Sequence, residues 1–138
     1  MNREVHLTLK NDVKELDTLA DFLEQLGEEW SLAPNITMAV NLSLEEAVSN
    51  IIFYAWDDSK EHLIDLKIQY CEKSLILLLS DDGKPFNPLM REDPDINLPI
   101  EERPIGGLGI HLIKKLMDGV SYERRENRNL MTLIKNLL

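Results

Sequence analysis

The sequence has little cysteine, few aromatic residues and no long apolar run. Its 138 residues include one cysteine, Cys71, so no internal disulfide is possible, and this favours a reducing, cytoplasmic compartment. No stretch approaches the roughly 18 apolar residues that span a bilayer. The first residues alternate in polarity instead of forming the apolar block of a signal peptide. We therefore expect neither a disulfide scaffold nor a membrane protein.

Basic residues are also scarce. The chain has 15 Lys and Arg against 25 Asp and Glu, which gives a net charge of −10. Non-specific binding of nucleic acid relies on basic side chains that release counterions from phosphates, so nucleic acid is not an expected direct partner. Residues 1–60 carry 4 basic and 12 acidic side chains, whereas residues 111–138 carry 6 and 3. The acidic half either steers a basic protein partner or simply maintains solubility.

Apolar periodicity predicts a single α/β domain, and its length is enough to bury a core. Alternation predicts strands over residues 5–9 and 64–70, an unbroken apolar run predicts one over residues 75–79, and a last hairpin is expected over residues 120–125 and 130–137. Spacings of three and four predict helices over residues 12–30, 35–56 and 109–118, the first capped by Asn11 or Asp12. This order predicts a two-layer α/β sandwich, in which helices cover one face of a mixed, mostly antiparallel sheet.

Two segments depart from simple alternation. Residues 75–79 are apolar throughout, which predicts a strand covered on both faces. Five of the six prolines lie between Lys84 and Ile105, and four of the six glycines stand at the edges of this segment. About 20 residues without an element of their own are typical of a lid or binding loop. We therefore predict a lid over residues 84–105.

The second predicted helix carries a carboxylate and an amide on a mostly apolar side. At 100° per residue, Asn50 lies about 40° from Glu46, whereas Glu45 falls at the exposed edge. An unpaired buried charge is costly, so this side of the helix requires a polar partner. Either it faces a polar ligand, or Glu46 and Asn50 rim a cleft or pair with neighbouring Lys or Arg side chains.

Two glycine-containing segments supply further candidates. Asp81 ends a buried strand and begins an Asp-Asp-Gly sequence; its carboxylate can accept a hydrogen bond from an amino group such as that of adenine, although this sequence is also an ordinary turn. Residues 106–109, Gly-Gly-Leu-Gly, lead into a helix, whose N-terminal amides suit a phosphate. Their spacing matches neither the P-loop nor the Rossmann pattern.

Together these segments resemble the GHKL (Bergerat-fold) ATPases. The N box of that superfamily corresponds to residues 46–50, its first glycine box to residues 81–83, and its second to residues 107–109. Within the superfamily, the chain resembles the RsbW-type anti-sigma-factor serine kinases over essentially its whole length. The resemblance includes Asp-Asp-Gly-Lys-Pro-Phe-Asn-Pro at residues 81–88, of which the Asp-x-Gly-x-Pro-Phe pattern at residues 81–86 is the most specific to this branch.

The resemblance implies a role for each polar residue of the N box. Asn50 would coordinate the Mg²⁺ that bridges the ATP phosphates, and Glu46 would be the general base. Magnesium prefers oxygen ligands, and phosphoryl transfer needs neutralised charge and an oriented nucleophile.

The resemblance also implies the nucleotide contacts. Asp81 would bind the adenine amino group and Gly83 would let the base approach closely, while the second glycine box would hold phosphate: Gly107, Leu108 and Gly109.

One position departs from the family pattern. Relatives often have a basic residue two places before the second glycine box, where this chain has Ile105. Arg103 and Lys84 are the candidate substitutes for a contact with the γ-phosphate. Loss of that contact would weaken phosphoryl transfer more than ATP binding, because only interactions that strengthen in the transition state accelerate chemistry.

The resemblance therefore implies a cytoplasmic, ATP- and Mg²⁺-dependent protein serine/threonine kinase. Such a protein would sequester a sigma factor, phosphorylate a small antagonist protein and form a homodimer. The alternative, which Ile105 motivates, is a nucleotide-dependent binding module without significant kinase activity. The ATP-binding half of a histidine kinase is disfavoured, because 138 residues leave no room for a dimerising helical domain. The three histidines and Cys71 lack ligand spacing, so no metal site of their own is expected.

Overall fold

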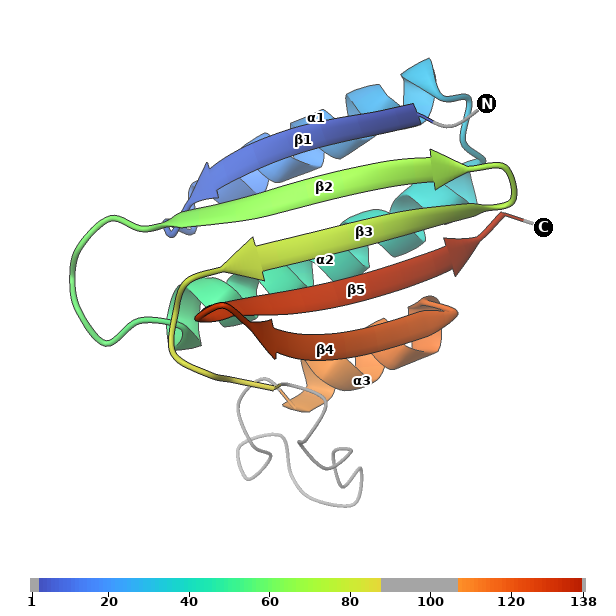
Figure 1. Ribbon diagram of the computed structural model, residues 1–138. Coiled ribbons are helices and arrows are strands. Elements are labelled where there is room, and N and C mark those ends of the chain that lie inside the picture. The colour runs from blue at the N-terminus through green and yellow to red at the C-terminus, as the bar shows by residue number, and fades with distance from the viewer. Residues whose placement is uncertain (1–2, 88–106, 138) are drawn as a thin grey trace.

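The computed structural model describes residues 3–87 and 107–137, which form a sheet backed by helices (Figure 1). The strands are β1 (Arg3–Lys10), β2 (Leu63–Cys71), β3 (Ser74–Asp81), β4 (Gly119–Arg125) and β5 (Arg128–Asn136). Their order in the sheet is β1-β2-β3-β5-β4, and all four pairings are antiparallel. The helices are α1 (Glu15–Glu29), α2 (Pro34–Tyr54) and α3 (Gly107–Leu116), and all lie behind one face of the sheet. The two-layer sandwich is confirmed, with a fully antiparallel sheet in place of a mixed one.

Local sequence explains where the first two helices begin. Before α1, the Oδ1 of Asp12 accepts a hydrogen bond from the backbone N–H of Lys14 at 3.0 Å, which turns the chain into the helix. The prediction that Asn11 or Asp12 caps this helix is wrong: the N-cap residue is Lys14, without a side-chain cap hydrogen bond. The Oδ1 of Asn11 instead accepts from the N–H of His62 at 2.9 Å. Pro34 occupies the first turn of α2, where its missing N–H costs nothing.

The core lies between the sheet and the helices, and β3 contributes only one of its faces to it. Leu75, Leu77 and Leu79 are fully buried, whereas Ile76 and Leu78 on the other face are half-buried. The prediction that this strand is covered on both faces is therefore wrong. An unbroken apolar run does not reveal which faces are covered, and all the described helices lie on one side.

The elements that the sequence singled out converge at one end of the sheet. The C-terminal ends of α2 and β3 lie there beside the start of β5 and the first turn of α3 (Figure 1). Of the predicted lid, only residues 84–87 are among the described residues; residues 88–105 lie outside them. Among the described helices, none combines the length and the apolar character that crossing a bilayer requires.

Candidate functional site

A mostly apolar pocket lies where these elements converge. It is lined by residues from α2, β3, α3, β4 and β5 and by residues just after α2 and β3: Ala47, Asn50, Ile51, Ala55, Leu79, Asp81, Phe86, Ile110, Tyr122, Asn129 and Met131. Asn50 and Asp81, two of the predicted site residues, therefore face the same space. A concave apolar site with a few converging polar groups is the usual form of a small-molecule site.

Asn50 is the polar group that α2 brings to this pocket. Its side chain is 8% exposed, and its Nδ2 has no hydrogen-bond partner among the described residues. An unsatisfied buried donor costs roughly 1–3 kcal/mol, which a polar ligand in the pocket would recover. The amide also offers an oxygen, the ligand atom that Mg²⁺ prefers. Asn50 thus fits a polar ligand that carries a magnesium ion.

Asp81 ends β3 with its side chain buried at 3% exposure. Its Oδ1 accepts hydrogen bonds from the backbone N–H of Gly83 at 2.9 Å and from the Nδ2 of Asn129 at 3.0 Å. A carboxylate has about four acceptor positions, so the group retains capacity for a ligand's amino group. These two bonds fix its orientation before any ligand arrives.

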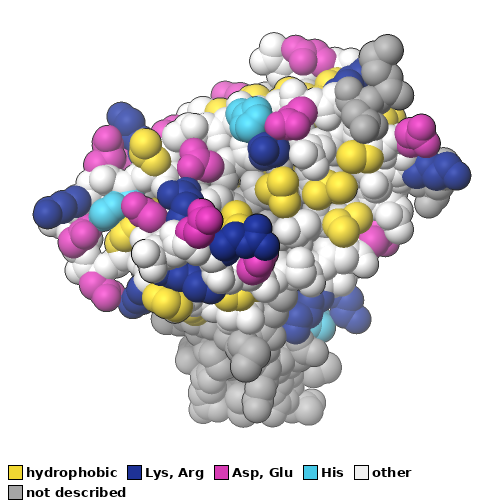
Figure 2. Space-filling view, viewed as in Figure 1, with side chains coloured by type: hydrophobic (Ala, Val, Ile, Leu, Met, Phe, Trp, Pro, Cys, Tyr) yellow, Lys and Arg dark blue, Asp and Glu magenta, His cyan; other side chains and the backbone are white. Residues whose placement is uncertain are grey.

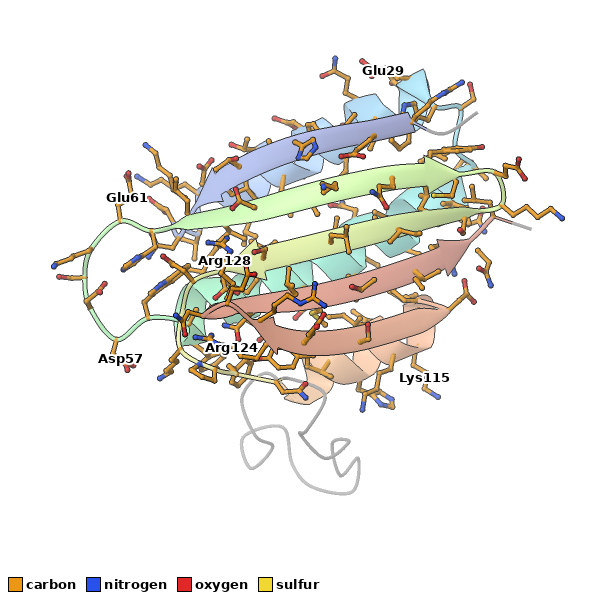
Figure 3. The ribbon with its side chains drawn as sticks, viewed as in Figure 1. Glu29, Asp57, Glu61, Lys115, Arg124 and Arg128 are labelled. Carbon is orange, nitrogen blue, oxygen red and sulfur yellow. The ribbon has the colours of Figure 1, made fainter. Side chains whose placement is uncertain are left out.

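Asn129, which the sequence did not single out, organises the polar side of the pocket. Its Nδ2 also donates to the backbone oxygen of Lys84 at 2.9 Å, and its Oδ1 accepts from the Oη of Tyr122 and from the Nη1 of Arg124 at 3.1 Å. The same Nη1 donates to the backbone oxygen of Gly83 at 2.7 Å. Figure 3 shows Arg124 at this end of the sheet. The start of β5 thereby ties down the chain that leaves β3.

Gly83 lies against the end of α2. A Cβ on this residue would lie 2.5 Å from the Cβ of Ala55 and 2.6 Å from its backbone oxygen, which real Cβ atoms do not approach. The next residue, Lys84, donates its backbone N–H to the same oxygen at 2.8 Å. The Nζ of Lys84 pairs with Asp57 at 2.9 Å, so in this structure the Lys84 ammonium group is directed at a carboxylate.

Glu46 lies on α2 close to the pocket, and the second glycine box leads into Ile110, which lines it. Glu46 is half-buried, one turn before Asn50 on α2. The residues of the second glycine box form the first turn of α3: Gly107, Leu108 and Gly109. The first N–H groups of a helix have no partner within it, and the helix dipole adds positive potential there. Arg103 and Ile105 lie outside the described residues.

The pocket is nearly filled by side chains in this structure. Phe86, just after β3, lines it and stacks on Tyr54 with ring centres 5.9 Å apart. The remaining space is about 30 Å³, whereas pockets for drug-sized ligands measure roughly 300–1,000 Å³. A ligand as large as a nucleotide therefore does not fit this space with the lining side chains, Phe86 among them, as they stand.

The donor set of the described residues limits how a metal ion could be held. Within residues 3–87 and 107–137, no group of three His, Cys, Asp or Glu side chains is placed to bind a metal. Of the side chains that line the pocket, Asn50 offers an oxygen that would hold a cation together with oxygens of a ligand and water. That is the usual arrangement for Mg²⁺ on a nucleotide.

This chain is similar to known proteins in sequence and in fold. Residues 9–135 match a family model described as a histidine kinase-like ATPase domain. The chain is 32% identical over 120 residues to the serine-protein kinase RsbW of Bacillus cereus, covering 83% of this chain and 71% of that one. It is 27% identical over 108 residues to the serine/threonine-protein kinase BtrW of Bordetella bronchiseptica, covering 78% and 75%.

A solved structure has a similar fold. The crystal structure of the RsbU and RsbW domains of a Mycobacterium tuberculosis protein matches with a TM-score of 0.63 at 15% identity. The match covers 98% of this chain and 32% of that longer one. At such low identity the likeness bears on the fold alone.

Proposed function

Because the chain belongs to the histidine kinase-like ATPase family, in the branch of the RsbW serine-protein kinases, we propose that it is an ATP-dependent protein serine kinase that acts as an anti-sigma factor. One observation carries the proposal for the site. Asn50 and Asp81 face a single pocket, and the first turn of α3 lies beside it. This arrangement provides a base-binding carboxylate, a magnesium-binding amide and a phosphate-binding helix terminus.

Each part of the nucleotide has a matching group in this site. Asp81, held by Gly83 and Asn129, accepts a hydrogen bond from the adenine amino group. Asn50 holds Mg²⁺, which when bound neutralises charge on the phosphates. The backbone N–H groups of Gly107, Leu108 and Gly109 bind phosphate oxygens at the N-terminus of α3.

Transfer of the γ-phosphate to a protein hydroxyl requires a general base and a positive charge near that phosphate. Glu46 is half-buried, whereas Asn50, one helical turn further along α2, is buried. A hydroxyl of a protein substrate can therefore reach the carboxylate of Glu46. Arg103 and Lys84 remain the candidates for the γ-phosphate contact; the Nζ of Lys84 pairs with Asp57 at 2.9 Å, and such an exposed ion pair contributes little energy.

The partners follow from the family branch. We place the protein in the cytoplasm, where it sequesters a sigma factor until a small antagonist protein, the phosphoacceptor, competes for it. The relatives named above are serine kinases, which favours this function over a binding module without kinase activity.

A homodimer can form through the open face of the sheet. Apolar side chains of β3 and β5 point to this face and are half-buried: Ile76, Leu78, Leu130 and Ile134. Figure 2 shows apolar side chains here between charged ones. The flanking strands carry both signs of charge, such as Lys67 with Glu4 and Arg125 with Glu123. A second copy related by a two-fold axis therefore meets an apolar strip and mixed charges, without net repulsion.

Transfer of radiolabelled phosphate tests the kinase activity. The probe is the antagonist protein encoded next to the gene for this chain, incubated with γ-labelled ATP and Mg²⁺. Glu46→Gln should still bind ATP but lose transfer by about 100-fold or more, the typical contribution of a general base. Glu45→Gln, one residue away and exposed, is the matched control and should transfer normally. Equal transfer by wild type and Glu46→Gln would remove Glu46 from the role of base.

A further inference from the structure

The exposed side of α2 carries apolar side chains that no described element covers. Five large hydrophobic side chains are exposed among the described residues, and three of them are on this helix: Met38 at 61%, Leu42 at 37% and Phe53 at 63%. At 100° per residue these three lie within about 60° of one another, so they share one side of the helix. We call them the α2 ridge. A row of exposed apolar side chains on one helix side is typical of an interaction surface.

A groove runs beside the α2 ridge, between α1 and α2. It measures about 660 Å³, with Glu24 and Glu28 on the α1 side and Met38 on the α2 side. Gly27 forms part of its floor, and a Cβ there would lie 2.8 Å from the Oγ1 of Thr37, so the glycine lets the two helices approach closely. Met38 belongs to both features, so the ridge and the groove form one continuous surface.

The charged side chains of α1 and α2 are all acidic. Residues 15–54, which contain α1 and α2, include eight Asp and Glu and not one Lys, Arg or His. A second copy of this chain would bring eight carboxylates against eight, which like-charge repulsion disfavours. A partner that fits here must present Lys or Arg around an apolar centre. The open sheet face differs, because its charges are of both signs.

The surface continues into the proposed site for phosphoryl transfer. Glu46 follows Leu42 by one helical turn, and Asn50, one turn further along α2, lines the nucleotide pocket. Phe53 extends the ridge past both residues, and its neighbour Tyr54 stacks on Phe86 of the pocket. A protein seated on the ridge would therefore have its own surface beside Glu46.

We infer that the α2 ridge and the adjoining groove are the docking surface for the phosphoacceptor protein, which binds through an apolar patch surrounded by basic side chains. The inference rests on the proposed kinase function and adds to it how the protein substrate is recognised. Apolar contacts with Met38, Leu42 and Phe53 supply affinity, whereas Glu24 and Glu28 attract the basic rim and speed association.

The first experiment removes the apolar contacts. Met38→Ser with Phe53→Ser should raise the Kd for the unphosphorylated antagonist protein encoded next to this gene by about tenfold or more, as expected for central apolar residues of an interface. KM for the antagonist should rise in parallel, while kcat and the Kd for Mg·ATP stay within about twofold. The matched control, Val13→Ser with Leu63→Ser, removes two similarly exposed apolar side chains elsewhere and should leave all four values unchanged.

The second experiment removes the charge. Glu24→Gln with Glu28→Gln should lower the association rate for the antagonist and flatten its dependence on salt, because screened attraction is lost. Glu61→Gln with Glu72→Gln changes the net charge equally at exposed positions outside this surface, and it should keep most of the association rate.

The outcomes separate the docking surface from the kinase function. If wild type and the Met38/Phe53 variant bind and phosphorylate the antagonist equally well, the docking surface is overturned while the kinase function stands. The docking surface is also overturned if the Val13/Leu63 control is equally impaired, or if the Met38/Phe53 variant loses only sigma-factor binding. If wild type fails to bind Mg·ATP, the kinase function fails, and this inference fails with it.

Discussion

Gly83 lies where β3 leaves the sheet, and its lack of a side chain lets this segment pack on Ala55 at the end of α2. Gly83→Ala should therefore destabilise the protein by about 1–3 kcal/mol, the usual cost of overpacking. It should also weaken ATP binding, because Asp81 accepts a hydrogen bond from the N–H of this residue. The free energy of unfolding from urea titration, together with a nucleotide titration, measures both effects.

Gly119→Ala is the matched control for that prediction. A Cβ on Gly119 would come no closer than 3.4 Å to the side chain of Ile134, which is close to ordinary contact. This variant should differ little from wild type in both measurements. Equal stability of the two alanine variants would contradict the packing argument for Gly83.

Residue patterns alone predict Asn50 and Asp81 but not Asn129. The helical wheel places Asn50 among apolar neighbours, and the end of a buried strand draws attention to Asp81; the structure brings both to one pocket. The same patterns leave Asn129 in a turn over residues 126–129. It instead lies in β5, directly opposite Asp81 of β3. Tertiary packing decides which residues of β3 and β5 lie opposite each other, and local sequence patterns carry no information about it.

The type of each helix and strand could be predicted from the sequence, whereas the length of the last turn could not. The last hairpin shows why. Its turn is Glu126-Asn127, with φ of 51° and 63°, so that β5 already begins at Arg128. Such two-residue turns are usually marked by glycine, and its absence here hid the correct length. Because β5 begins at Arg128 and not two residues later, Asn129 lies in the strand and lines the pocket.

The side-chain hydrogen bonds in the connection from α2 to β2 can be tested by a pH titration. The hydrogen bond from the side chain of His62, followed by that from the N–H of Lys60, holds the pKa of Asp58 below its ordinary value of 3.8. A lowered pKa in the folded state means that the stabilisation is present above pH 3.8 and is lost as the pH falls below that value. His62→Phe keeps a ring to stack on Trp56 but removes one bond.

An NMR titration of the Asp58 carboxyl carbon measures this effect. In wild type the midpoint should lie below 3.8. In His62→Phe it should move upward towards that value without passing it, because the bond from Lys60 remains. Identical midpoints in the two proteins would show that the His62 hydrogen bond is absent in solution.

At the scale of the whole molecule, the order of the elements predicts the two layers, because strands joined by hairpins form a sheet that grouped helices can cover. The open face of the sheet could not be predicted in this way. The run of residues 75–79 is apolar on both faces, and this pattern does not show which face the helices cover and which they leave open.

The proposed homodimer is tested by the mass in solution. Wild type should have the mass of two chains in sedimentation analysis. Leu78→Lys places a charge in the apolar strip and should give the mass of one chain while ATP binding is retained. Thr18→Lys adds the same charge at an exposed position on α1 and should remain dimeric. A dimeric Leu78→Lys variant would place the contact elsewhere.

Calorimetric titration of the wild-type protein with Mg·ATP measures whether the pocket between α2, β3 and β5 is a nucleotide site. We predict saturable binding of one nucleotide per chain. Asp81→Asn should weaken it by at least about tenfold, because the amide presents a donor where the adenine amino group needs an acceptor. Asn50→Ala should weaken binding mainly when Mg²⁺ is present. No binding at millimolar nucleotide, or equal binding by wild type and Asp81→Asn, would show that this pocket is not the ATP site.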